Sequence, residues 1–163
     1  MADPSGSAPL VIQAITEEQA RAASTWRYPG PYAIYDHAPE DWQRFLAPEY
    51  RYHAVLADCE LLGYCCFGED ARVPGGKYPP DALDVGAGMR PDLVGRGRGR
   101  SLLAAILEFG RATYSAQAFA ATVAAFNQRA RALCCSAGFE EVCRFVSESD
   151  DPREFVILLR RPS

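Results

Sequence analysis

Residues 90–101 read RPDLVGRGRGRS and lead directly into the apolar residues Leu102, Leu103, Ile106 and Leu107. This apolar spacing predicts an amphipathic helix that begins where the glycine-rich stretch ends. Alternating glycines remove the Cβ atoms that would hold a ligand away from the backbone. The N–H groups at a helix N-terminus attract anions. The stretch therefore predicts a pyrophosphate site, to which its arginines add fixed positive charge.

The pattern differs from two well-known phosphate-binding loops. It lacks the Lys-Ser/Thr ending of a Walker A loop, and its G-x-G-x-G spacing is not the G-x-G-x-x-G of a dinucleotide-binding fold. A solvated Arg/Gly turn is the alternative interpretation of this segment taken alone. The rest of the sequence is needed to distinguish a pyrophosphate site from a solvated turn.

Length and composition predict an ordinary globular domain. The 163 residues are 48% hydrophobic and 23% charged, which suits a single domain with a sizeable core. A net charge of −4 disfavours a nucleic-acid-binding protein, although the basic cluster at residues 90–100 could attract a small polyanion. No apolar run approaches the roughly 20 residues that span a membrane, so we expect no membrane association. Residues 1–9 lack an apolar signal core and are expected to be a disordered tail of a cytoplasmic protein.

The cysteines do not form a recognisable metal-binding or disulfide pattern. Two adjacent pairs occur but no C-x-x-C, and both histidines are remote from every cysteine in sequence, so we predict no metal site. The thiols are expected to be mostly reduced, buried and inert. The six residues are Cys59, Cys65, Cys66, Cys134, Cys135 and Cys143.

The remaining sequence predicts a mixed α/β sheet with helices on both faces. Helices are expected from the capping box at residues 16–19 toward Trp26, at 39–46, from the glycine-rich stretch to about Tyr114, and between Asn127 and Gly138. Prolines at 29 and 31 predict loop geometry for residues 26–35, and residues 68–80 are expected to form a long excursion. Strands are expected at residues 10–15, 50–57, 61–67, 83–89, 118–125, 139–146 and 155–159, with a tight turn at 58–60.

Three separated features give the chain a resemblance to a known family. A strand leads into the glycine-rich stretch, a second strand ending at Val123 is followed by Asn127, and residues 130–139 end in LCCSAGF. In this order and spacing they resemble the GNAT superfamily of acyl-CoA-dependent N-acetyltransferases, over about residues 10–160. The resemblance implies a single N-acetyltransferase domain over residues 10–163, with a mostly antiparallel twisted sheet. Two parallel strands, near Met89 and Val123, are expected to splay apart.

The resemblance also implies acetyl-CoA as the cofactor. Its pyrophosphate is expected on the loop backbone and its pantetheine arm along the preceding strand and beside Asn127. Val94 stands where Gln or Arg is usual, and this departure is expected to do little damage because the loop acts chiefly through its backbone. The cofactor-binding residues implied are Gly88, Met89, Arg90, Val94, Gly95, Arg96, Gly97, Arg98, Gly99, Arg100 and Asn127.

The catalytic groups implied by the resemblance are only partly present. The backbone N–H of Met89 is expected to stabilise the oxyanion. Cys134 occupies the position that often carries a Tyr general acid, and it could either protonate the departing thiolate or merely pack. Thr122 stands where some members carry a Glu base. Asp84 is our first choice for the general base, and Glu69 and Asp70 are the alternatives.

The acceptor amine is expected to bind against the segment between the first strand and the hairpin. Four rings in a proline-braced loop favour an aromatic or cationic small molecule, although the same rings could simply cover the sheet. Lys77 and Tyr78 in the long excursion are expected to close over the site. The substrate-binding residues implied are Trp26, Tyr28, Tyr32 and Tyr35.

The sequence therefore predicts an enzyme that transfers an acetyl group from acetyl-CoA to a primary amine of a small molecule or peptide by direct attack. The missing Tyr and Glu keep a catalytically idle acyl-CoA-binding module as the alternative. A polyanion or RNA contact through residues 96–100 is a third interpretation, which the acidic net charge disfavours. The sequence leaves open whether the chain acts as a monomer or as a homodimer.

Overall fold

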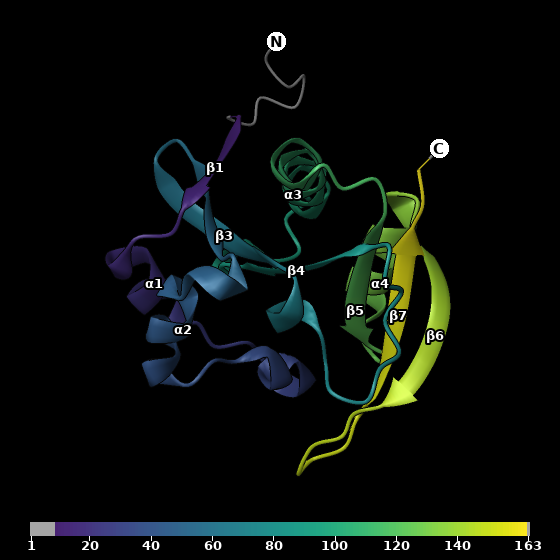
Figure 1. Ribbon diagram of the computed structural model, residues 1–163. Coiled ribbons are helices and arrows are strands. Elements are labelled where there is room, and N and C mark those ends of the chain that lie inside the picture. Colours follow the sequence, from purple (N-terminus) through teal and green to yellow (C-terminus); the bar gives the residue numbers. More distant parts are fainter. Residues whose placement is uncertain (1–8, 163) are drawn as a thin grey trace. The chain divides into compact units, whose positions relative to one another are not determined.

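The computed structural model describes residues 9–162, and the tail predicted at residues 1–9 lies outside this range except for Pro9. The chain divides into two compact units (Figure 1). The first contains the residues up to Cys65 together with Ala87–Ile106, and the second contains Cys66–Gly86 and the residues from Leu107 onward. Each unit is described by itself. Among residues 9–162, no helix is long and apolar enough to cross a membrane.

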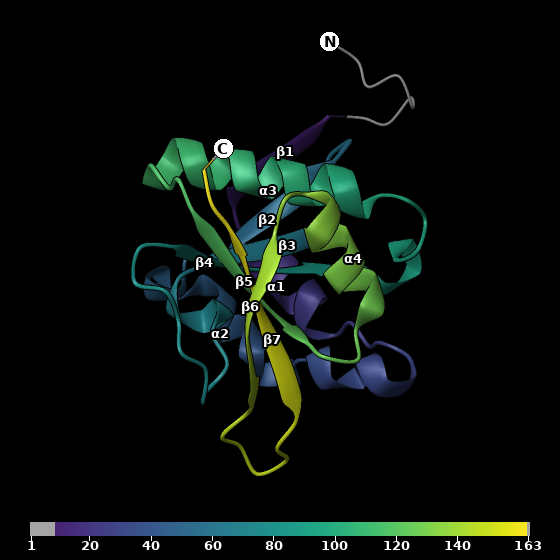
Figure 2. The ribbon, with the colours of Figure 1, turned by 90° about the vertical axis from the view of Figure 1, so that its right-hand side faces the viewer.

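In the first unit, the strands are hydrogen-bonded in the order β1-β2-β3-β4. The β1-β2 and β2-β3 pairs are antiparallel, and residues 58 and 59, both with positive φ, form the tight turn predicted between β2 and β3. Figures 1 and 2 show α1 and α2 on one side of these strands and the first part of α3 on the other. The elements are β1 (Leu10–Ala14), α1 (Glu17–Ser24), η1 (Gly30–Tyr35), η2 (Pro39–Asp41), α2 (Trp42–Leu46), η3 (Pro48–Tyr50), β2 (His53–Ala57), β3 (Glu60–Phe67), β4 (Leu83–Met89), η5 (Pro91–Leu93) and α3 (Gly99–Tyr114).

Helix α1 begins at the predicted capping box. The Gln19 N–H donates to Thr16 Oγ1 at 3.2 Å, and the Thr16 N–H donates to Gln19 Oε1 at 2.9 Å. Both contacts satisfy N–H groups that a helix start leaves without intrahelical partners. The helix then buries Ala20 and Ala23 and packs against α2.

The prediction of loop geometry for residues 26–35 is wrong for their second half. Gly30–Tyr35 forms the 3₁₀ helix η1, with a proline in its first turn. Proline is tolerated there because its missing N–H would have no helical acceptor. The two prolines therefore start a helical turn instead of excluding one.

In the second unit, the strands are hydrogen-bonded in the order β4-β5-β7-β6. The parallel ladder between β4 and β5 contains the pairs Leu83↔Phe119 and Asp84↔Ala120, whereas β5-β7 and β6-β7 are antiparallel ladders of six pairs each. The prediction of a mixed, mostly antiparallel sheet with one short parallel pair is therefore confirmed. The further elements are η4 (Glu69–Ala71), β5 (Phe119–Ala124), α4 (Gln128–Ser136), β6 (Glu140–Val146) and β7 (Glu154–Arg160).

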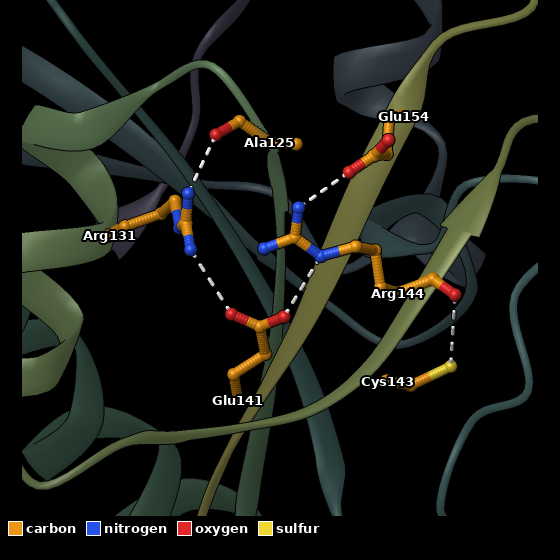
Figure 3. A network of polar contacts seen from close by, with 6 residues as sticks. All are labelled: Ala125, Arg131, Glu141, Cys143, Arg144 and Glu154. Atoms are coloured by element: carbon orange, nitrogen blue, oxygen red, sulfur yellow. Dashed lines mark hydrogen bonds and ion pairs between the residues drawn. The ribbon is translucent and has the colours of Figure 1, made fainter.

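A chain of charged side chains ties α4 to β6 and β7 (Figure 3). Arg131 on α4 donates to the Ala125 carbonyl at 2.8 Å and to Glu141 on β6 at 3.1 Å. Arg144 donates to Glu141 at 3.1 Å and to Glu154 on β7 at 2.6 Å. Hydrogen bonding by Arg144 is the main reason that the pKa of Glu141 is lowered. The network fixes how α4 lies against the hairpin of the second unit.

Candidate functional site

The glycine-rich loop has the backbone shape that an anion site requires. Gly95 and Gly97 have φ values of +80° and +76°, a conformation that residues with a Cβ rarely adopt. A Cβ added to Gly97 would have no heavy atom within 4 Å, so the space above this glycine is open. The Leu102 N–H donates to the Arg98 carbonyl at 3.1 Å, so residues 99–101 supply the unpaired N–H groups of a helix start.

The arginines near this loop differ in their exposure and in whether they form ion pairs. Arg96 and Arg100 are exposed and Arg98 is half-buried. Arg90 is ion-paired through Nε to Asp92 Oδ1 at 2.7 Å, and this hydrogen bond is the main reason that the pKa of Asp92 is lowered. The charge of Arg90 is therefore partly satisfied within the protein, whereas the other three belong to the loop itself or to the first turn of α3.

The end of β4 presents Met89 on the edge opposite to β3. The Arg90 N–H donates to the Leu62 carbonyl of β3 at 2.8 Å. Because successive residues of a strand direct their backbone groups to opposite edges, the N–H and C=O of Met89 face away from β3. The two predicted backbone contacts therefore differ in availability. The Met89 N–H faces away from β3, whereas the Arg90 N–H is already hydrogen-bonded within the sheet.

Position 88 requires a glycine because the Tyr64 side chain lies directly against the backbone of β4. A Cβ on Gly88 would overlap the ring and hydroxyl of Tyr64, and a Cβ on Gly86 would come within 3.0 Å of Cys66 Sγ. Both glycines of this strand therefore mark places where other groups approach its backbone closely. The groups that approach are side chains of β3.

The predicted acceptor segment reaches the end of β4 through Tyr28. Its hydroxyl donates to the Met89 carbonyl at 2.7 Å, and its N–H donates to Asp36 Oδ1 at 2.9 Å. Burial, and then the charge of Asp36, raise the pKa of Tyr28 to about 12, so its hydroxyl remains a donor at neutral pH. Tyr28 thus contacts the residue whose N–H is the predicted oxyanion donor.

The other residues predicted to bind the acceptor amine lie in two different places. The Trp26 ring stacks on Tyr64 with centroids 6.0 Å apart, within an aromatic cluster that also contains Phe45 and Tyr52. Tyr32 and Tyr35 are half-exposed on η1. Trp26 therefore contacts β3 through Tyr64, and Tyr28 contacts β4 through Met89.

Sequence reasoning missed three polar residues beside this cluster. His37 Nε2 lies 2.8 Å from the Tyr64 hydroxyl, and His37 Nδ1 lies 3.6 Å from Asp41 Oδ2. Tyr64 is buried, whereas the His37 and Asp41 side chains are 24% and 35% exposed. The only signal in the sequence was the four-residue spacing of His37 and Asp41, because Tyr64 follows 27 residues after the histidine.

Asp84, our first choice for the base, lies in the second unit within an ion pair. Its Oδ2 accepts a hydrogen bond from Arg72 Nε at 2.6 Å, its side chain is 4% exposed, and its Oδ1 is buried without a partner. Burial raises the pKa of this carboxyl, although the hydrogen bond and charge of Arg72 lower it. A substrate ammonium could reach Oδ2 only by displacing Arg72, which favours a structural role. The alternatives Glu69 and Asp70 lie on η4.

Tyr78 holds the long excursion to the sheet of the second unit. Its hydroxyl accepts from the Val73 N–H at 2.7 Å and from Thr122 Oγ1 at 3.0 Å. The ring packs against the buried cluster of Ala120, Ile157 and Leu159. Thr122, which stands at the position of the family's Glu, is therefore used to anchor this loop.

Cys134 and Asn127 lie at opposite ends of α4. Burial, and then the neighbouring Cys135, raise the pKa of the Cys134 thiol to about 11. Proton transfer from this thiol to a thiolate of ordinary pKa, about 8.5, would be uphill by about 3 kcal/mol, which favours a packing role. Asn127 caps α4 as predicted, its side chain accepting from the Ala130 N–H at 3.1 Å.

Comparison with protein-family models matches residues 13–139 to the acetyltransferase (GNAT) family. The chain belongs to this family. Among solved structures, similar folds include a chimera of the Vibrio cholerae spermidine N-acetyltransferase SpeG and hSSAT, at 16% identity and a TM-score of 0.73 over 94% of this chain and 96% of that one. A GNAT-family acetyltransferase from Bacillus anthracis has 13% identity and a TM-score of 0.73 over 94% and 95%.

A third solved structure with the GNAT fold, AAC(6')-Ib in complex with paromomycin and acetyl-CoA, has 15% identity and a TM-score of 0.72 over 94% of this chain and 93% of that one. Comparison with curated protein sequences gives no significant match. At these identities the structural similarity shows the GNAT fold, and the chemistry of this GNAT protein has to be argued from its own residues.

Proposed function

We propose that this GNAT protein is an N-acetyltransferase that transfers an acetyl group from acetyl-CoA to a primary amine by direct attack. The observation that carries the proposal is the open, left-handed glycine loop at the start of α3. The backbone of residues 95–99 fits a pyrophosphate because its glycines leave room and a helix N-terminus supplies N–H donors. Arg96, Arg98 and Arg100 would add charge around it.

The acyl chemistry would take place at the end of β4. When bound, acetyl-CoA supplies an activated acetyl group. The Met89 N–H, which faces away from β3, would donate to the oxygen that becomes negative during transfer. Tyr28 donates to the Met89 carbonyl, which belongs to the following peptide group, and would thereby help to hold the backbone on the C-terminal side of that N–H. Asn127 beside the pantetheine remains a prediction that rests on the family resemblance.

The acceptor proposed is an amine cation that binds near Trp26 and Tyr28. Aromatic faces attract cations, and the half-exposed Trp26 ring presents such a face beside Tyr64. The structurally similar proteins include a spermidine N-acetyltransferase and a paromomycin complex, and both ligands are polyamines. These names support a small polycationic acceptor over an acidic peptide.

The test is detection of an acetylated product. The protein would be incubated with acetyl-CoA and separate amines: a polyamine, an arylalkylamine, an aminoglycoside and a lysine peptide. We expect mass spectrometry to find at least one N-acetylated amine and no acetylated protein when amine is omitted, because direct attack needs no acetyl-enzyme. Acetyl-CoA binding without any acetylated amine would instead support the idle acyl-CoA-binding module, which the burial of Cys134 makes a specific alternative.

A further inference from the structure

The polar residues His37, Asp41 and Tyr64 form a row in the first unit, in which a hydrogen bond joins Tyr64 to His37 and an ion-pair contact joins His37 to Asp41. The row runs from Tyr64 on β3 through His37 to Asp41 on η2, over 2.8 Å and then 3.6 Å. Asp41 is itself held in place, because its Oδ2 accepts the Ala38 N–H at 3.0 Å. We propose that this row is a proton relay that takes the proton from the acceptor ammonium, an inference that rests on the proposed acetyl transfer.

Aromatic packing fixes the relay in one orientation. The His37 ring meets Phe45 edge-on at 4.9 Å between centroids and Tyr64 at 5.7 Å. Phe45, which is 2% exposed, also packs edge-on against Tyr64 at 5.1 Å. Asp41 of η2, Tyr64 of β3 and the apolar Phe45 of α2 therefore all face the imidazole. Rings packed in this way cannot rotate freely, which keeps His37 Nε2 directed at the hydroxyl.

The buried end of the relay lies against β4. The overlap of a Gly88 Cβ with the Tyr64 hydroxyl places that hydroxyl over the backbone of Gly88. Met89, the proposed oxyanion donor, is the next residue, and successive strand residues are about 3.3 Å apart. An amine attacking a carbonyl held at Met89 would therefore be within reach of the Tyr64 oxygen.

The proton transfer balances without any further reactant. The ammonium gives one proton to the Tyr64 oxygen while the Tyr64 proton moves to His37 Nε2. The amine becomes neutral and free to attack, and the positive charge passes to an imidazolium paired with Asp41. The Nδ1 proton then leaves to water from the half-exposed end of the relay. Imidazole suits this step because it is the side chain that titrates near neutral pH.

The relay would supply a base where the family's Glu is missing and Asp84 is already paired. Thr122 replaces the family's Glu and anchors Tyr78, and Asp84 is held by Arg72. Tyr64 would touch the acceptor directly, whereas His37 and Asp41 would act through it. A base of this kind was invisible in the sequence because Tyr64 of β3 is distant in sequence from His37 and Asp41, which lie before and within η2.

The experiment is a pH profile of kcat/KM for amine acetylation by the wild type, His37→Gln and Tyr64→Phe. Glutamine can still accept the Tyr64 hydrogen bond but cannot take up a proton. We expect both variants to lose on the order of 10²-fold at neutral pH. We expect their rates to rise about tenfold per pH unit toward the pKa of the amine, where free amine becomes abundant. His53→Gln is the matched control, since His53 lies on β2 outside the relay and its Nδ1 is bonded to the Arg51 carbonyl.

A second measurement, NMR titration of the two histidines, does not depend on turnover. Asp41→Asn should lower the pKa of His37, because the carboxylate favours the imidazolium, and should leave His53 unchanged. A pH profile of kcat/KM in His37→Gln that matches the wild type would overturn the relay. A His37 pKa that is the same in Asp41→Asn and in the wild type would also overturn it. Loss of the neutral-pH rate in Asp84→Asn but not in His37→Gln would assign the base to Asp84 instead. A wild type that acetylates no amine would overturn the proposed function itself.

Discussion

Gly97 is the residue on which the cofactor assignment depends most. Its φ of +76° and the empty space where a Cβ would lie suit close approach of a pyrophosphate. Gly97→Glu should abolish acetyl-CoA binding measured by calorimetry, because a side chain and a negative charge would occupy the phosphate position. Gly30→Glu has the same sign of φ and the same open space, and it should share the backbone strain but still bind. Retained binding in a folded Gly97→Glu protein would refute the assignment.

Tyr28 should affect catalysis more than binding. Tyr28→Phe removes the 2.7 Å hydrogen bond to the Met89 carbonyl and leaves the ring in place. Losing a bond worth about 1 kcal/mol should lower kcat several-fold, with the affinity for acetyl-CoA nearly unchanged. Tyr50→Phe is the control, since the Tyr50 ring faces the Arg44 guanidinium instead. Equal kcat values for Tyr28→Phe and the wild type would show that Met89 needs no such support.

Cys134 should behave as a packing residue. Its burial and raised pKa make the thiol a poor proton donor to a thiolate. Cys134→Ala should lower the free energy of unfolding by about 1–2 kcal/mol because it leaves a small cavity, and turnover should stay within a few-fold of the wild type. The exposed Cys135→Ala is the matched control for stability. A loss of turnover near 10²-fold at unchanged acetyl-CoA affinity would return Cys134 to the role of general acid.

At the scale of elements, β4 carries the buried carboxylate Asp84, which is ion-paired to Arg72. Asp84 has a raised pKa in the folded protein, so its contribution to stability is fully present below its ordinary pKa, near 4, and is lost as pH rises through the raised value. Chemical denaturation should therefore show the wild type losing stability relative to Asp84→Asn as pH rises above about 4. A stability difference independent of pH would mean that burial does not perturb this carboxyl.

The elements were largely predictable because their signals are local. The Thr16–Gln19 capping box, the Asn127 cap and the positive φ of Gly138 all depend on residues within one turn of each other. The 3₁₀ helix at Gly30–Tyr35 was not predictable in the same way, since its prolines fit either a loop or a helix start. The contact between Tyr78 and Thr122 was not predictable because the two residues are 44 positions apart.

At the scale of the whole molecule, the proposed cofactor loop is visible in the sequence and the proposed proton acceptor is not. The loop is one continuous segment whose glycines and helix start are visible together. The row of His37, Asp41 and Tyr64 exists only after β3 is placed beside the 3₁₀ segments, and the carboxylate that looked available in sequence, Asp84, is held by Arg72. Backbone sites are therefore easier to predict here than sites assembled from side chains of different elements.

The central claim is that this GNAT protein transfers acetyl groups to an amine. The most direct measurement is the initial rate of free CoA release from saturating acetyl-CoA, with and without a polyamine, followed with a thiol reagent. We predict release that depends on the amine, saturates with its concentration and disappears in Gly97→Glu. Bound acetyl-CoA that releases no CoA with any amine of the panel, or release at the same rate without amine, would contradict the account.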